Sequence, residues 1–269
     1  KPRILSTYAD LSNIERNYAL DVMRFNLLWS QGYTGEGMVI GVVDSGIDDA
    51  HEMLRDKIIS GYNFSNDGNP TDDIADYHYH GTSVSALICG NYIDYRRYGV
   101  APNAKVVVAK CMNAAGKGSL EAITNAINYC VDNNVDIINC SVGSLSNSDN
   151  MEKAVRNAVA KGIPVVVASG NDGNGDYGAI REVSYPAAYD DSICVGAIDK
   201  EFNVTAFSNS NEFVDFVAPG TQILTAYPNN NQYALVEGTS FAAPLISGAL
   251  ALLKEKFIKD FQRYPNEAE

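Results

Sequence analysis

The sequence predicts an α/β fold with a mostly parallel central β-sheet and helices on both of its faces. Short apolar runs alternate along the chain with longer amphipathic segments, which is the pattern of parallel strands connected by helices. The length points the same way, because 269 residues suit one large α/β domain better than two small ones. A domain of this size buries roughly 75% of the surface that its unfolded chain exposes.

The periodicity places the elements along the chain. We expect strands at residues 38–44, 105–110, 136–140, 164–168 and 192–198. We expect helices at residues 80–89, 119–133, 150–161 and 240–257. Polar or glycine-rich loops are expected at residues 63–79, 144–150, 171–183 and 228–232. The domain should span residues 26–269, preceded by an N-terminal arm at residues 1–25, and the polar tail after Phe257 is expected to fray.

Composition limits the partners of this chain. The net charge of −13 argues against nucleic acid or an anionic membrane surface. A well-solvated surface explains this charge, and attraction of cationic peptides is the alternative. No uninterrupted apolar run of about 18 residues occurs, so no membrane span is expected. The chain begins with Lys1 and no signal-like segment follows, so we expect a processed or engineered mature form.

The five cysteines cannot all pair with one another, and none of their spacings forms a C-x-x-C motif. Most have apolar neighbours, as Cys89 and Cys194 do, so we expect small core side chains and no metal site. A thiol-rich chain without a disulfide pattern favours a reducing compartment and hence a cytoplasmic location, while secretion stays open.

Three distant stretches each carry one side chain suited to nucleophilic catalysis. Asp44 ends an apolar run, His80 precedes a glycine at a helix start, and Ser240 lies in a Gly-Thr-Ser stretch before another helix. A serine hydroxyl is a weak nucleophile until a base removes its proton, and that base needs a buried acid to hold its tautomer. The order Asp, His, Ser therefore predicts an acid, a base and a nucleophile.

A fourth stretch around Asn171 follows an apolar run and offers a side-chain amide of the type that stabilises an oxyanion. With these four motifs in order, the chain resembles the subtilisin family of serine peptidases, the subtilases, from about Trp29 to Leu253. The resemblance implies a subtilisin-like fold. It also implies that Asp44 orients His80, that His80 shuttles the proton of Ser240, and that Asn171 donates to the oxyanion.

Each catalytic candidate also has a structural interpretation. Serine is favoured at helix N-caps, so Ser240 could be a cap, and asparagine beside glycine is common in turns, so Asn171 could be a turn residue. His80 at a helix start would otherwise be an ordinary solvated residue. Asp48 and Asp49 are alternative carboxylates to Asp44, but both are typical of turns. The agreement of four motifs favours the catalytic interpretation.

Other residues help to separate the alternatives. His78 is expected in a loop near the cleft, where it would help to shape the second substrate subsite, whereas His51 is expected to be structural. Ala242 stands where a G-x-S-x-G elbow would have glycine, which disfavours an α/β-hydrolase nucleophile.

The resemblance implies how an extended peptide would bind. One edge of the groove would pair with the substrate backbone, and a second edge would face it. These edges would be formed by Ser141, Val142 and Gly143 on one side and by Gly116 and Gly118 on the other. Leu120 and Ile123 have two interpretations: they form the floor of a distal apolar subsite, or they pack in the core.

The first specificity pocket would be lined by Ala168, Ser169 and Gly170, with Ser184 near its base. Acidic side chains near this pocket and the neighbouring subsite suggest a preference for basic substrate side chains as a hypothesis. They are Asp172, Asp72, Asp73 and Asp76.

Two features depart from the family pattern. Ser83 replaces a usual second histidine after His80, at a position with no chemical role. Many relatives bind a structural calcium at positions that here hold Met53 and Ile93, whose side chains offer no hard oxygen ligand. We expect no cofactor for the chemistry and an absent or altered calcium site, with Asp215 a candidate for a weaker cation site.

The predicted function is that of a serine endopeptidase that hydrolyses peptide bonds through an acyl-enzyme intermediate. The alternatives are a catalytically quiet subtilase-like binding or regulatory protein and a non-peptide acyl hydrolase. Expected partners are a peptide or protein substrate in an extended conformation and the chain's own propeptide, with no nucleic acid and no membrane.

Overall fold

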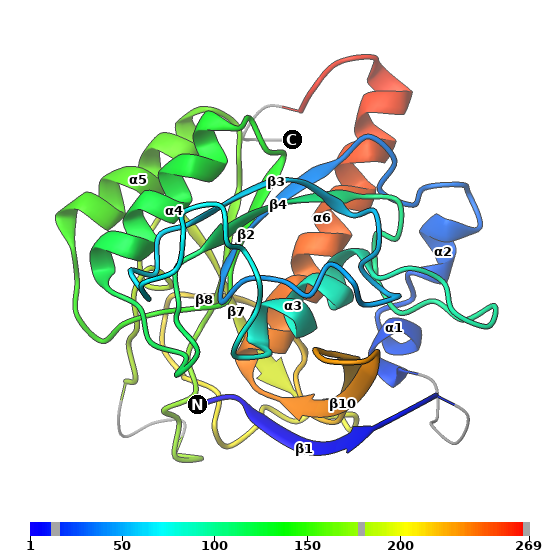
Figure 1. The fold of residues 1–269 in the computed structure, drawn as a ribbon, viewed down its shortest axis with the longest axis horizontal. Helices are drawn as coiled ribbons and strands as arrows, with labels where there is room; N and C mark the ends of the chain where they lie inside the picture. Colours follow the sequence, from blue (N-terminus) through cyan, green and yellow to red (C-terminus); the bar gives the residue numbers. More distant parts are fainter. Residues whose placement is uncertain (12–16, 177–180, 266–269) are drawn as a thin grey trace.

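The computed structural model describes residues 1–11, 17–176 and 181–265. Within these ranges, seven strands form a parallel central sheet in the order β3-β4-β2-β5-β6-β7-β8 (Figure 1). The five strands that the sequence predicted are β2 (Val39–Asp44), β4 (Lys105–Lys110), β5 (Ile137–Cys140), β6 (Val165–Ala168) and β7 (Ser192–Ile198). The predicted fold class is confirmed, with boundaries within one residue.

Helices cover both faces of this sheet. The helices α4 (Leu120–Asp132) and α5 (Asp149–Ala160) lie on one side, and α3 (His80–Cys89) and α6 (Thr239–Phe261) lie on the other (Figure 1). Because successive strand residues point to opposite faces, each strand contributes to two separate cores. In β2, Val42 packs on the side of α3 and α6, whereas Val43 packs on the side of α4 and α5.

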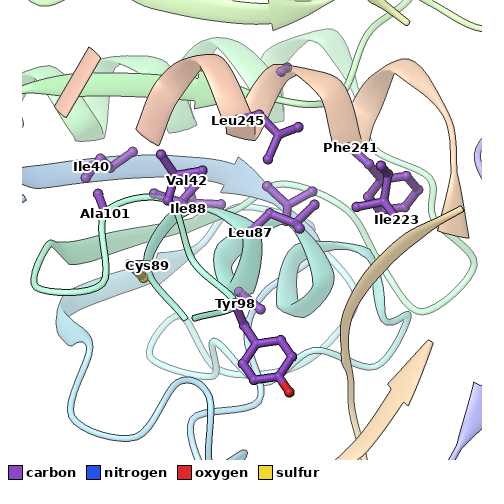
Figure 2. Close-up of a cluster of buried hydrophobic side chains, with 14 of the residues drawn as sticks. Ile40, Val42, Leu87, Ile88, Cys89, Tyr98, Ala101, Ile223, Phe241 and Leu245 are labelled. Carbon is purple, nitrogen blue, oxygen red and sulfur yellow. The ribbon is translucent and has the colours of Figure 1, made fainter. Parts of the chain in front are cut away.

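The core between α3, α6 and β2 fixes the two helices that carry His80 and Ser240. Figure 2 shows Leu87 and Ile88 of α3 beside Phe241 and Leu245 of α6, over Val42 of β2. Each of these side chains is at most 1% exposed. Burying a side chain of this size stabilises the fold by roughly 1.5–3 kcal/mol.

Two strands at the edges of the sheet were not predicted. They are β3 (Ile58–Asn63) and β8 (Val214–Pro219). Their outer side chains lie at the surface, for example Ile59 at 56% and Phe216 at 53% exposure. At the edge of the sheet some side chains of a strand face solvent. The sequence of an edge strand therefore lacks the continuous apolar run by which the buried strands were recognised.

A small antiparallel sheet was also missed. Its order is β1-β10-β9, with bounds Arg3–Tyr8, Gln232–Glu237 and Ile223–Tyr227. The turn between β9 and β10 falls in the predicted loop at residues 228–232, and Asn229, Asn230 and Asn231 adopt the left-handed conformation that asparagine tolerates.

The N-terminal region packs against this body. β1 pairs with β10, and the short helix α1 (Tyr18–Val22) buries Ala19 and Leu20 in the core; α2 (Asn26–Trp29) follows. The division into an arm and a domain at residue 26 stays a prediction. The predicted fraying after Phe257 was wrong up to Phe261, where α6 ends, and residues 266–269 lie outside the described part. The same holds for residues 177–180 of the predicted loop at 171–183.

Adjacent strands end side by side where the candidate residues lie. β2 pairs with β5 and β5 pairs with β6, all in parallel, so their carboxyl ends meet at one edge of the sheet. Asp44 is the last residue of β2, Ser141 follows β5, and Asn171 comes shortly after β6. Ligands bind open parallel sheets at this edge.

Candidate active site

Asp44 and His80 form a buried hydrogen-bonded pair. The Nδ1 atom of His80 lies 2.8 Å from Oδ1 and 3.0 Å from Oδ2 of Asp44, and both side chains are at most 3% exposed. The backbone N–H of Ser45 donates to the same carboxylate at 2.7 Å. A carboxylate at Nδ1 favours the tautomer with its proton there, which leaves Nε2 as the basic nitrogen.

Two opposing effects set the pKa of His80. Burial of the ring lowers the pKa, because an imidazolium is poorly solvated in the interior, but the charge and hydrogen bond of Asp44 raise it. The net result is a pKa above the ordinary value of 6.5. His78 shifts the other way, since burial and then repulsion from His80 lower its pKa.

The backbone just before His80 is strained and firmly held. Tyr79 has φ = 121°, a conformation that costs energy for a residue with a side chain. Asp76 holds it there, because its carboxylate accepts hydrogen bonds from Ser45, Thr82 and the backbone N–H groups of residues 78 and 79. This buried carboxylate therefore joins the loop before His80 to the end of β2.

The same contacts correct one expectation about specificity. Asp76 was a candidate for attracting basic substrate side chains, but it is buried and fully engaged in the protein interior. Burial raises its pKa, yet the hydrogen bonds, led by that of Thr82, lower the pKa overall. Asp72, by contrast, is exposed.

Ser240 is the second residue of α6, and its hydroxyl is no helix cap. The cap residue is Gly238, and the structure records no side-chain cap at this end. The Ser240 hydroxyl donates instead to the backbone carbonyl of Ser141 at 3.1 Å. Among the described residues, Nε2 of His80 has no hydrogen-bond partner. The hydroxyl must therefore rotate before it can donate to His80.

Asn171 is oriented by its neighbour on the helix start. Its side-chain oxygen accepts from the backbone N–H of Thr239 at 2.8 Å and from the Thr239 hydroxyl at 3.2 Å. The accepting end of the amide is thus occupied, and the Nδ2 end is the one left to donate. Gly238, just before Thr239, has φ = 147°, and a Cβ there would lie 3.0 Å from Pro2, so this position favours glycine.

A cleft of about 500 Å³ connects these residues. The predicted site residues that line it are His80, Gly116, Gly118, Ser141, Val142, Gly143, Ala168, Gly170, Asn171, Ser184 and Ser240. His78 and Asp172 line it as well. At its edge, Gly116 has φ = 66°, which favours glycine, and a Cβ there would lie 2.7 Å from Nε2 of His78.

Ser169 does not line the cleft; it is fully buried beneath it. Its carbonyl accepts from the Ser184 hydroxyl and from Nδ2 of Asn209, each at 2.8 Å. Asn209 also accepts from the N–H of Asp172 and so braces this wall, a role with no signal in the sequence. Sequence reasoning also missed Lys1 and Pro2 in the lining, because β1 was not foreseen.

The two positions at which the resemblance implies calcium ligands hold apolar side chains. Met53 is fully buried in the apolar core, and Ile93 packs against that core. In the same loop, the Arg97 guanidinium lies 4.3 Å from the Trp29 ring and 4.8 Å from the Tyr92 ring. Neither Met53 nor Ile93 offers the hard oxygen ligand that calcium prefers.

Within the described ranges, no group of three or more His, Cys, Asp or Glu side chains could hold a metal ion. Asp215, the candidate for a weaker cation site, accepts a hydrogen bond from the N–H of Cys194 at 2.8 Å.

Comparisons with known proteins agree with this geometry. A hydroxyl that opens a helix beside a carboxylate-bound imidazole points to the class of serine hydrolases. Residues 35–266 match the subtilase family. The chain belongs to the subtilase family and is a subtilisin-like serine endopeptidase.

Three relatives illustrate the match. The Major intracellular serine protease of Bacillus subtilis (strain 168) is 42% identical over 252 residues, which are 93% of this chain and 78% of that protein. The Intracellular serine protease of Paenibacillus polymyxa is 38% identical over 251 residues, 93% of this chain and 76% of that protein. Subtilisin DY of Bacillus licheniformis is 34% identical over 244 residues, 89% of this chain and 85% of that protein.

A pH profile tests the Asp44–His80 pair. Since neutral His80 would be the base, kcat/KM should fall on the acid side with an apparent pKa above 6.5. Asp44→Asn removes the charge that raises this pKa, so kcat should drop about 10⁴-fold and the acid limb should move to lower pH. His78→Gln is the control and should leave the limb in place. An acid limb that Asp44→Asn does not move would contradict this assignment.

A stability measurement tests the brace at Asp76. Asp76→Ala strands several buried donors, each at a cost of about 1–3 kcal/mol, so denaturant unfolding should show a loss of at least about 3 kcal/mol. The lowered pKa means that this stabilisation is present above the ordinary value of 3.8 and is lost as the pH falls towards the folded-state pKa. Asp72→Ala, in the same loop but exposed, should change stability by less than about 0.5 kcal/mol. Equal effects of the two variants would rule out the brace.

Proposed function

We propose that this subtilase cleaves peptide bonds in extended polypeptides with Ser240 as nucleophile, His80 as general base and then acid, and Asp44 as the residue that orients His80. The observation that carries the proposal is the buried bond between Asp44 and Nδ1 of His80, at 2.8 Å. That bond leaves Nε2 free to accept a proton and supplies the charge that stabilises the imidazolium.

The first step is the formation of the acyl-enzyme. The Ser240 hydroxyl turns from the Ser141 carbonyl to Nε2 of His80 and attacks the substrate carbonyl carbon while its proton passes to Nε2. When the tetrahedral intermediate collapses, the C–N bond breaks and the amine leaves with the proton from His80. Water, activated by the same nitrogen, then hydrolyses the ester and restores Ser240.

The developing oxyanion needs donors that are already in place. Nδ2 of Asn171 supplies one, because the Asn171 oxygen is held by Thr239. The backbone N–H of Ser240 supplies the other, since it lies in the first turn of α6, where N–H groups lack helical acceptors. Removing one such donor costs on the order of 10²–10³ in kcat.

The substrate would lie as an added strand in the cleft. Ser141, Val142 and Gly143 form one edge and Gly116 and Gly118 the other. An incoming backbone N–H would compete for the Ser141 carbonyl that holds the Ser240 hydroxyl. Binding of the peptide would then favour the rotation towards His80. A basic preference at the first pocket rests on Asp172 and remains part of the proposal.

Location and further partners are also proposals. Two of the relatives carry the word intracellular in their names, and all five cysteines are free and buried, which supports a cytoplasmic location. None of the described helices is long and apolar enough to cross a membrane. The chain's own propeptide is a proposed partner on the family membership alone. The charge of −13 supports the proposal that nucleic acid is no partner.

A covalent probe tests the proposed nucleophile. A fluorophosphonate should label the wild-type chain at Ser240, as located by mass spectrometry of the digested protein, and Ser240→Ala should abolish both labelling and peptide cleavage. Ser144→Ala, on the same side of the cleft, is the control and should be labelled like the wild type. A wild-type chain that folds but is not labelled would refute the proposal and favour the catalytically quiet alternative.

Chelation tests the proposed absence of calcium at the family site. A calcium ion present at 100 times its dissociation constant would add about 2.7 kcal/mol of stability, which excess EGTA would remove. We expect the unfolding transition of this chain to be the same in EGTA and in CaCl₂. A clear loss of stability in EGTA, restored by calcium and not by magnesium, would show a resident calcium ion.

A further inference from the structure

Pro244 leaves the nucleophile's own carbonyl without its helical partner. In an α-helix the carbonyl of residue 240 accepts from the N–H of residue 244, and proline has no N–H. Pro244 lies inside α6 and is buried, so water does not replace the missing donor. The Ser141 hydroxyl does so instead, donating to the Ser240 carbonyl at 3.0 Å.

The direction of the Ser141 hydroxyl is set from behind. Nδ2 of Asn139 donates to this hydroxyl at 2.9 Å, and an amide nitrogen cannot accept. The proton of the Ser141 hydroxyl is therefore left for the Ser240 carbonyl. The other end of the Asn139 amide accepts from the Ser247 hydroxyl at 2.8 Å, which is shorter than the 3.3 Å from that hydroxyl to its alternative acceptor, the Ala243 carbonyl.

These four residues form a continuous buried relay from Ser247 through Asn139 and Ser141 to Ser240. Their exposure is 0% for Ser247 and Asn139 and 4% for Ser141 and Ser240. Asn139 is the polar residue in the buried strand β5, two positions after Ile137, whose side chain packs on the α6 side. A buried polar group in a central strand is costly unless each of its bonds is made.

We propose that Asn139 is a positioning residue for the nucleophile, acting through the Ser141 hydroxyl on the backbone of Ser240. The inference rests on the proposed role of Ser240. The Ser240 backbone carries both the attacking hydroxyl and one of the oxyanion donors, so a small shift misplaces two groups at once. Ser247 is the outer support of the relay, because it orients the Asn139 amide.

Kinetics of variants test this relay. Asn139→Ala and Ser141→Ala should each lower kcat for a peptide substrate by about 10- to 100-fold with little change in KM, since the backbone edge of the cleft remains. Because Asn139 acts through Ser141, adding Asn139→Ala to Ser141→Ala should cost nothing more in kcat. The rate of fluorophosphonate labelling should fall in parallel with kcat, and rates should be expressed per folded molecule.

Matched variants separate positioning from general stability. Ser192→Ala removes another buried hydroxyl that donates to a backbone carbonyl, that of Pro186 at 2.8 Å, outside the relay. It should lower stability and leave kcat unchanged. Ser247→Ala keeps the Asn139 amide but loosens it, so kcat should fall by a smaller factor, and this variant serves if Asn139→Ala does not fold.

The outcomes distinguish this inference from the proposed function. The relay would be overturned if the losses in kcat of Asn139→Ala and Ser141→Ala multiplied in the double variant. It would also be overturned if kcat were unchanged in both Asn139→Ala and Ser247→Ala. Labelling of Ser240 could persist in either case. Failure of the wild-type chain to be labelled would instead remove the proposed nucleophile itself.

Discussion

The hydrogen bond between Asp44 and His80 is the constraint around which the site is arranged. A carboxylate that ends a buried strand is costly without a partner, and the imidazole supplies one. For the two to meet, α3 must begin at the carboxyl edge of the sheet, directly beside β2. The strained backbone at Tyr79 and the bonds made by Asp76 are the local means by which the chain reaches that position.

The other residues of the cleft are positioned by rigid strands and helices. Asn171 and Ser141 extend from adjacent parallel strands, and Ser240 belongs to a helix packed in the apolar core shown in Figure 2. The Asn171 side chain and the Ser240 backbone are each held by a bond from a neighbour, so both oxyanion donors are directed before substrate arrives. Such preorganisation is what makes electrostatic stabilisation of a transition state effective.

Much of this architecture could be predicted, and the exceptions share a physical cause. The buried strands are visible because each is a continuous apolar run. Asp44, His80, Asn171 and Ser240 are visible because the four motifs that carry them match the subtilase pattern in order. The edge strands lack that pattern. Residues such as Asn209 and Asn139 act through contacts between segments remote in sequence, which no local pattern records. Asp76 was misjudged for the same reason, since its burial depends on how its loop folds over β2.

The Ser240 hydroxyl has two acceptors within reach of a rotation, the Ser141 carbonyl and Nε2 of His80. It donates to the Ser141 carbonyl, while Nε2 of His80 has no partner among the described residues. Hydrogen bonds to a carbonyl and to a neutral imidazole differ little in net free energy, each being worth about 0.5–1.5 kcal/mol. A peptide that occupies the Ser141 carbonyl would remove one of the two acceptors and leave Nε2 of His80 for the hydroxyl. Because the Ser141 carbonyl belongs to the edge on which a peptide would lie, the residue that holds the hydroxyl in the free enzyme is also one that substrate would engage.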